Sequence, residues 1–221
     1  MLHIFDLDHT VYNGSTVRDF LKLSLRTGKL KPSFFTEVPL LLIRFLLGKG
    51  NQATLNRRYS FLKGIDKSEL EDSAVFLFNS RFKKNLNSSM VRIIETLQKN
   101  REKTAVATSS FRVLVEPLTK HLKFDLLFAT ELEFQDNRTT GAISGNAVYG
   151  QSKKETVEKF LIRERISPED CRFYSDSHRD LPLLEFVGSP VAVNPDFILA
   201  RTAKKKNWEI IRDRTRHGRR K

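Results

Sequence analysis

Five short apolar runs alternate with amphipathic segments along this chain, and this alternation constrains its fold most strongly. The apolar runs are residues 2–7, 104–108, 126–129, 171–175 and 190–193. The segments with helical periodicity are residues 88–99, 111–122, 153–163 and 181–187. Short apolar strands separated by helices are typical of a parallel sheet covered by helices on both faces. The sequence therefore predicts an α/β fold with a doubly wound, Rossmann-like parallel sheet.

Residues 14–87 interrupt this alternation, because they hold several helical patterns and almost no strand pattern. Apolar residues recur at helical spacing near residues 20–25, 38–46 and 70–82. We therefore predict an all-helical cap domain at residues 14–87, inserted after the first strand. Residues 1–13 and 88–221 would form the core domain.

The most apolar part of the predicted cap is residues 34–47. This run contains Glu37, Pro39 and Arg44, and it is too short to span a bilayer comfortably. A helix packed into the protein core is the favoured interpretation. A helix that lies on a membrane surface is the alternative.

The chain is strongly basic, with a formal net charge of +13 at pH 7. Residues 201–221 alone hold ten Lys and Arg residues against Glu209 and Asp213. Such an end is most often solvated, but it also suits an anionic partner such as a membrane surface. Nucleic acid is not expected as a partner, because no zinc-finger, helix-turn-helix or RNA-binding motif is present. A nucleic-acid-binding module without enzymatic activity is therefore the weakest of the function classes.

Cys171 is the single cysteine, so the chain forms no internal disulfide, which suits a reducing compartment. The N-terminal residues show no signal-peptide pattern. We expect a cytoplasmic protein, with peripheral contact to the inner membrane surface as the alternative.

Polar residues with chemical potential follow three of the predicted strands. They are Asp6 and Asp8 after the first strand, Thr108 to Ser110 after the second, and Asp176 to Asp180 after a later one. Lys153 begins a predicted helix. In open parallel sheets, ligands bind beyond the carboxyl ends of the strands, so we expect these segments to converge at one edge.

The spacing of Asp6 and Asp8 suggests a cation, because two carboxylates this close in sequence repel each other. Magnesium prefers hard oxygen ligands. The carboxylates of Asp6 and Asp176, with the backbone carbonyl of Asp8, would supply three of them. The sequence therefore predicts a Mg²⁺ site.

These residues resemble a known family. Asp6-x-Asp8-x-Thr10, Thr108, Lys153 and Asp176-x-x-x-Asp180 match, in order, the four motifs of haloacid dehalogenase-like phosphohydrolases. Residues 140–155 and 174–196 look most like subfamily IB, which has a helical cap and includes the phosphoserine phosphatases. The resemblance implies a Mg²⁺-dependent phosphatase.

The resemblance also implies a role for each motif residue. Asp6 would be the nucleophile that forms an aspartyl-phosphate, and Asp8 would be the general acid and base. Thr108, Ser109 and Lys153 would bind the phosphoryl oxygens. Asp6, Asp8 and Asp176 would hold the metal. Asp180 would orient Lys153 or a metal-bound water.

The substrate is less constrained than the reaction. Phosphoserine phosphatases carry a Glu shortly after the first motif, where this chain has Ser15, and Ser-Gly-Gly where it has Thr108-Ser109-Ser110. We predict a small phosphorylated metabolite. The alternative is a membrane-associated lipid phosphate phosphatase, because residues 39–50 resemble the apolar helix of phosphatidylglycerophosphate phosphatases of this family and the cap is basic.

Overall fold

The computed structural model describes residues 1–28, 31–47, 52–56 and 58–213. Within these residues, seven strands form one sheet in the order β4-β3-β2-β1-β5-β6-β7. The strands are β1 (Leu2–Phe5), β2 (Lys103–Phe111), β3 (Leu126–Gln135), β4 (Arg138–Ser144), β5 (Cys171–Ser175), β6 (Ser189–Val193) and β7 (Glu209–Ile211). All neighbouring strands are parallel except β3 and β4. The predicted doubly wound parallel sheet is confirmed.

The helices lie close to the predicted segments. They are α1 (Thr16–Arg26), α2 (Phe34–Leu46), α3 (Gln52–Leu55), α4 (Lys67–Leu77), α5 (Ser88–Lys99), α6 (Arg112–His121), α7 (Gln151–Glu164), α8 (Leu181–Leu184) and α9 (Phe197–Lys205). Short 3-10 turns are η1 (Ser60–Leu62), η3 (Lys83–Asn85), η4 (Pro168–Asp170) and η5 (His178–Asp180), and η2 (Phe78–Phe82) is a π-helical turn. The described elements between β1 and β2 are all helical, which agrees with the predicted helical insertion.

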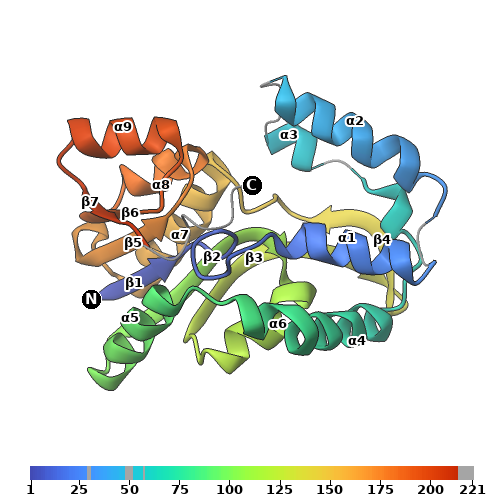
Figure 1. Ribbon diagram of the computed structural model, residues 1–221, viewed down its shortest axis with the longest axis horizontal. Helices are drawn as coiled ribbons and strands as arrows, with labels where there is room; N and C mark the ends of the chain where they lie inside the picture. The colour runs from blue at the N-terminus through green and yellow to red at the C-terminus, as the bar shows by residue number, and fades with distance from the viewer. Residues whose placement is uncertain (29–30, 48–51, 57, 214–221) are drawn as a thin grey trace.

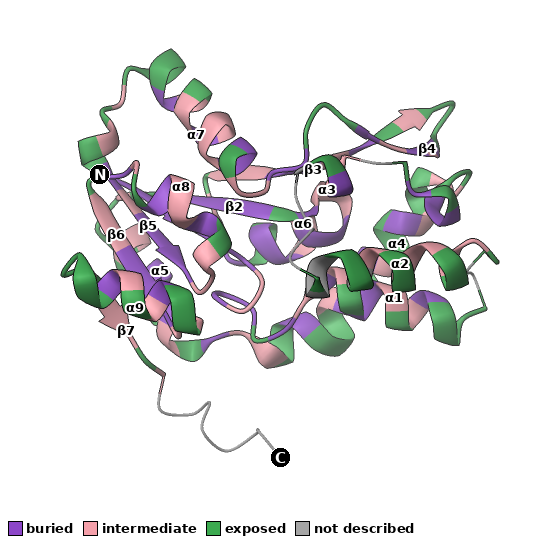
Figure 2. Ribbon diagram, turned by 90° about the horizontal axis from the view of Figure 1, so that it is seen from above, coloured by how far each residue is buried: buried purple, intermediate pink, exposed green. Residues whose placement is uncertain are grey.

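The two faces of the sheet bury separate apolar clusters, because alternate side chains of each strand point to opposite faces. Phe5 and Val106 lie in the cluster covered by α4, α5 and α6. Ile4 and Ala105 lie in the cluster covered by α7, α8 and α9. Burial of the strands on both faces explains their continuous apolar runs; Figure 2 shows β2 and β5 largely buried.

The central strand β1 marks the point where the chain reverses its direction of travel across the sheet. The chain passes from β1 to β2 and β3 on one side, and later from β5 to β6 and β7 on the other. The crevice at such a reversal is where ligands bind in open α/β sheets. The segments that follow β1, β2 and β5 therefore meet at this crevice.

The helical insertion lies at the opposite end of the molecule from α9 and β7 (Figure 1). The hairpin of β3 and β4 holds it through backbone hydrogen bonds, from Tyr59 N–H to the Gly141 carbonyl at 2.6 Å and from Thr139 N–H to the Ile65 carbonyl at 2.9 Å. Arg138 Nε also contacts Asp66 Oδ1 at 3.0 Å. The proposed boundaries of the cap at 14 and 87 stay a prediction.

Two parts of the sheet differ from the sequence prediction. The predicted strand at 126–129 continues to Gln135 and turns into the unpredicted antiparallel strand β4. The edge strand β7 is also unpredicted, and it has only three residues, paired with β6. Both extensions depend on pairing with a neighbouring strand, which local periodicity does not reveal.

Candidate active site

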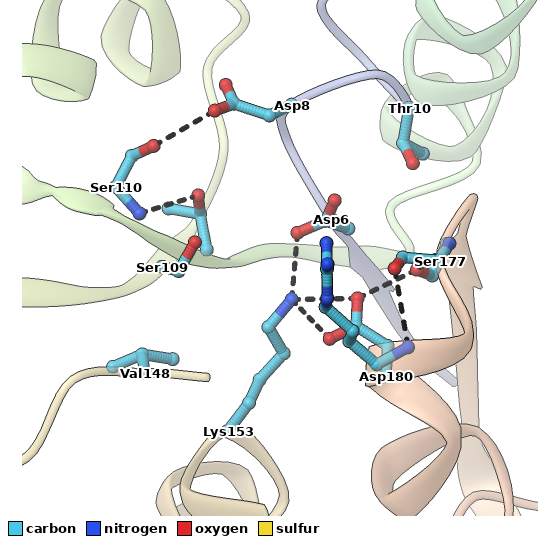
Figure 3. A network of polar contacts seen from close by, with 12 residues as sticks. Asp6, Asp8, Thr10, Ser109, Ser110, Val148, Lys153, Ser177 and Asp180 are labelled. Atoms are coloured by element: carbon cyan, nitrogen blue, oxygen red, sulfur yellow. Dashed lines mark hydrogen bonds and ion pairs between the residues drawn. The ribbon is translucent and has the colours of Figure 1, made fainter. Parts of the chain in front are cut away.

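Asp6 lies directly beyond β1, and its carboxylate is paired with Lys153. The Asp6 N–H donates to the Tyr174 carbonyl at 2.9 Å, which continues the contact between β1 and β5 and fixes the backbone. The side chain is buried, and Lys153 Nζ donates to Asp6 Oδ1 at 2.8 Å. Figure 3 shows the lysine pointing from α7 toward Asp6.

The ammonium group of Lys153 bridges two carboxylates. It donates to Asp6 and, also at 2.8 Å, to Asp180. Asp180 is held from its other side by Ser175 Oγ, which donates to Asp180 Oδ2 at 2.7 Å. Burial alone would lower the pKa of Lys153, but the charges of Asp180 and Asp6 outweigh it and raise that pKa above its usual range. Lys153 is therefore a fixed positive charge beside Asp6.

The electrostatic balance at Asp6 favours a further cation. Burial raises the pKa of Asp6 well above 3.8, Lys153 opposes this rise, and the charges of Asp180 and Asp176 add to it. Three carboxylates thus act on one another beside a single lysine. A divalent cation would compensate the remaining negative charge.

Asp8 lies two residues further on, in a different environment. Thr16 N–H donates to both its oxygens, at 3.1 and 3.2 Å, and Ser110 Oγ donates to Oδ2 at 3.2 Å. Figure 3 shows Asp8 turned toward Ser110, while Asp6 faces Lys153. Burial raises the pKa of Asp8 to about 6, against the hydrogen bonds from Thr16 and Ser110 that lower it. The two carboxylates therefore differ in partners and in charge state.

Thr108 and Ser109 stand at the carboxyl end of the part of β2 that pairs regularly with β3. The pairing shifts register between Thr108 and Phe111. Thr108 is buried, and its Oγ1 accepts a hydrogen bond from Ser110 N–H at 3.2 Å. Ser109 is exposed at this turn. Both predicted phosphate-binding residues thus lie on the strand next to β1.

Asp176 follows β5 and is half-buried. Thr10 Oγ1 donates to Asp176 Oδ1 at 3.3 Å, which links the loops after β1 and β5. Within the described part of the chain, no three His, Cys, Asp or Glu side chains gather as a metal-binding group. The predicted set does not need three, since it consists of two carboxylates and a backbone carbonyl. All three are oxygen donors, which fits Mg²⁺.

Two residues of this network were not predicted from the sequence. Thr16 is the first residue of α1 and contacts Asp8, and Ser175 is the last residue of β5 and contacts Asp180. Each occupies an element end beside a motif residue. That position is the one signal that points to them in the sequence.

A family model described as haloacid dehalogenase-like hydrolase matches residues 4–185 of this chain. These residues include every predicted site residue. A match over most of the chain establishes the family.

Relatives and solved structures agree with this assignment. A phosphoserine phosphatase of Mycobacterium tuberculosis is 26% identical over 93% of this chain and 68% of its own length. A Bordetella pertussis protein of unknown function superimposes with a TM-score of 0.85, at 25% identity, over 95% of this chain and 97% of its own. A substrate-bound phosphoserine phosphatase complex has a TM-score of 0.70, at 23% identity, over 96% and 93% of the two chains, and shares the fold. The chain therefore belongs to the haloacid dehalogenase-like hydrolase family, as an enzyme of its phosphoserine phosphatase-like branch of phosphatases.

Proposed function

We propose that this phosphatase hydrolyses a phosphate monoester of a small metabolite through a covalent aspartyl-phosphate on Asp6. The observation that carries the proposal is the division of labour between two neighbouring carboxylates. Asp6 is paired with the fixed charge of Lys153, whereas Asp8 has a pKa near 6 and is held by Thr16 and Ser110. One carboxylate is suited to attack and the other to proton transfer.

The reaction would proceed in two displacements at phosphorus. In the first, an Asp6 carboxylate oxygen forms a bond to phosphorus while the ester oxygen leaves and takes the proton from Asp8. In the second, Asp8 removes a proton from water, and that oxygen attacks the phosphorus of the aspartyl-phosphate. The bond to Asp6 breaks and inorganic phosphate is released. A pKa near 6 lets Asp8 serve in both directions.

The remaining motif residues would bind the transferring phosphoryl group. Lys153 supplies a positive charge that burial keeps unscreened by water. The hydroxyl groups of Thr108 and Ser109 lie on the adjacent strand end. Asp180 would hold Lys153 in place, because it accepts from the same ammonium at 2.8 Å.

Mg²⁺ would be held by the carboxylates of Asp6 and Asp176 and by the backbone carbonyl of Asp8. When bound, it would neutralise charge on the phosphoryl oxygens and on the two carboxylates. The oxygen donor set and the excess of carboxylates over cations at Asp6 support this assignment.

The names of relatives support a phosphate monoester as substrate. Besides the phosphoserine phosphatases, a histidinol-phosphatase of Neisseria meningitidis is 31% identical over 54% of this chain and 55% of its own length. Ser15, at the position where phosphoserine phosphatases carry a Glu, weighs against phosphoserine itself.

The first experiment measures hydrolysis of p-nitrophenyl phosphate with Mg²⁺ and with EDTA. Asp6→Asn should lose at least about a thousandfold in kcat, because the nucleophile is gone. Asp72→Asn, an exposed acid on α4, is the matched control and should keep full activity. Mass spectrometry of the acid-quenched enzyme should find phosphate on Asp6. Undiminished turnover by Asp6→Asn would overturn the mechanism.

A membrane-associated lipid phosphate phosphatase is the second candidate, and one observation favours it. On α2 and just beyond it, Phe35, Ile43 and Leu47 are 61%, 50% and 64% exposed. No helix in the described ranges is long and apolar enough to cross a membrane. A surface-lying helix needs no such length. The predicted basic end falls partly outside the described residues, since the structure describes the chain to residue 213.

Co-sedimentation with vesicles containing phosphatidylglycerol tests this candidate at moderate salt. Wild type should pellet with the vesicles, and Ile43→Glu should remain mostly in the supernatant. Ile162→Glu, which changes a 71% exposed residue on α7, is the matched control. Failure of wild type to pellet would eliminate membrane association.

A further inference from the structure

A cavity of about 630 Å³ opens from the proposed proton donor into the helical cap. Asp8, Ser109 and Ser110 line its inner end. Its walls come from α1, α2, α3, η1 and the turn after β2. Cavities of this size typically bury most of a drug-sized molecule. The cavity is therefore much larger than a phosphate group requires.

The walls of the cavity are predominantly apolar. Each cap element contributes large side chains: Phe20, Leu21 and Leu25 from α1, Phe34, Val38 and Leu41 from α2, and Phe61 and Leu62 from η1. Phe111 and Ala147 close it on the core side. Among the described residues that line it, Asp8 is the one acidic side chain.

The polar side chains on the walls are engaged with the protein itself. Thr130 Oγ1 donates to the Ser109 carbonyl at 2.9 Å and accepts from Val148 N–H at 3.0 Å. Tyr59 OH donates to the Leu55 carbonyl at 2.8 Å. Polar groups bonded in this way have little capacity left for a ligand. The cavity beyond Asp8 thus offers contact area more than hydrogen bonds.

We propose that the substrate is a phosphate monoester whose leaving group is large and apolar, and that this group fills the cavity. The inference rests on the proposed function, because Asp8 as proton donor must lie beside the ester oxygen. The leaving group attached to that oxygen then extends from Asp8 into the cap. Burying it against these walls supplies the binding free energy.

The same walls select against an amino-acid phosphate. An ammonium group on the leaving side would be buried with Asp8 as its nearest acidic partner, and Asp8 is needed for proton transfer. Burial of an unpaired charge is strongly unfavourable. The cations at this cavity, Arg18 and Lys22 of α1, are exposed and lie four residues apart, where they attract the anionic ester without entering the apolar walls.

The test is a series of n-alkyl phosphates, from ethyl to decyl, below their critical micelle concentrations and without membranes. kcat/KM should rise roughly fourfold per added methylene until the cavity is filled, as expected from about 0.8 kcal/mol per buried methylene. O-phosphoserine should be a poorer substrate than hexyl phosphate by at least about a hundredfold, which the same coefficient supports. 1-Naphthyl phosphate distinguishes an aromatic from an aliphatic leaving group.

A pair of variants locates the effect in the cavity. Leu41→Glu places a charge on the wall, and it should flatten the dependence on chain length while turnover of ethyl phosphate changes less than about threefold, since ethyl buries few methylenes. Val75→Glu, at a 50% exposed position on α4, is the matched control and should keep the dependence. Should Leu41→Glu fail to fold, Leu41→Trp fills the cavity instead and should shorten the longest accepted chain.

Three outcomes separate this inference from the proposed function. Equal kcat/KM along the series, or a preference for O-phosphoserine, would overturn the apolar leaving group and leave the phosphatase mechanism intact. Binding of n-alkyl phosphonates, which contain no ester bond, is measured by calorimetry. Tighter binding with longer chains, without hydrolysis of any ester, would support the cavity's role and overturn the proposed mechanism. Neither hydrolysis nor length-dependent binding would overturn both.

Discussion

Thr16, the first residue of α1, donates hydrogen bonds to Asp8 from both its backbone N–H and its hydroxyl group. The same hydroxyl lies 2.6 Å from Ser110 Oγ. The first turn of the helical insertion is therefore attached to the proposed general acid and to the end of β2. Movement of α1 relative to the sheet would alter the position and the pKa of Asp8.

Thr16→Val tests this coupling, because it removes the hydroxyl group and preserves both the shape and the backbone N–H. One hydrogen bond that lowers the pKa of Asp8 is lost, so the basic limb of the kcat profile should move to higher pH. We expect kcat to fall about tenfold, which corresponds to about 1.4 kcal/mol in the barrier. Thr27→Val, at the other end of α1, is the control. An unchanged pH profile would show that Thr16 acts through packing alone.

The pair of Lys153 and Asp180 predicts a stability effect separate from catalysis. Lys153→Met leaves Asp6 and Asp180 buried without their cation, so the free energy of unfolding should fall by about 3–5 kcal/mol. Adding Asp180→Asn should restore part of the stability but none of the activity, because the double variant buries one charge fewer. Urea denaturation of the three proteins without metal measures this. Equal stability of wild type and Lys153→Met would contradict the described pairing.

Gly141 joins the hairpin to the helical insertion, and its backbone conformation and surroundings require glycine. It has φ +81°, and an added Cβ would meet the Tyr59 carbonyl oxygen at 2.6 Å. Gly145 has a similar φ of +75° but open space around its missing Cβ. Gly141→Ala should therefore lower the melting temperature more than Gly145→Ala does, because both strain the backbone and only the first collides. Equal losses would mean that the hairpin yields without cost.

The raised pKa of Asp8 predicts how stability without metal depends on pH. Its folded-state pKa of about 6 lies above the ordinary value of 3.8, so the folded protein binds this proton more tightly than the unfolded chain. The resulting stabilisation is complete below about pH 3.8 and is lost as pH rises to about 6. Wild type in EDTA should therefore lose stability relative to Asp8→Asn over this window. A constant difference between the two unfolding free energies would contradict the pKa shift.

Local patterns in the sequence determined much of this protein. The period-two burial of strands such as β1 and the apolar spacing of helices such as α5 depend on near neighbours in the chain, and both were predicted at nearly their observed bounds. The order of Asp6, Thr108, Lys153 and Asp176 pointed to the family for a similar reason, since each stands at the end of a predictable element. The roles of these residues stay predictions.

Tertiary structure alone decided the features that depend on contacts between distant segments. The partners of Asp8 include Ser110, which is far away in the chain, and the separate environments of Asp6 and Asp8 come from α7 on one side and α1 on the other. Strands β4 and β7 exist because a neighbouring strand offers its backbone, and the cavity exists because α1, α2 and η1 pack around empty space. Local periodicity carries no information about which surfaces meet. The charge states and the leaving-group pocket of this enzyme therefore follow from its packing.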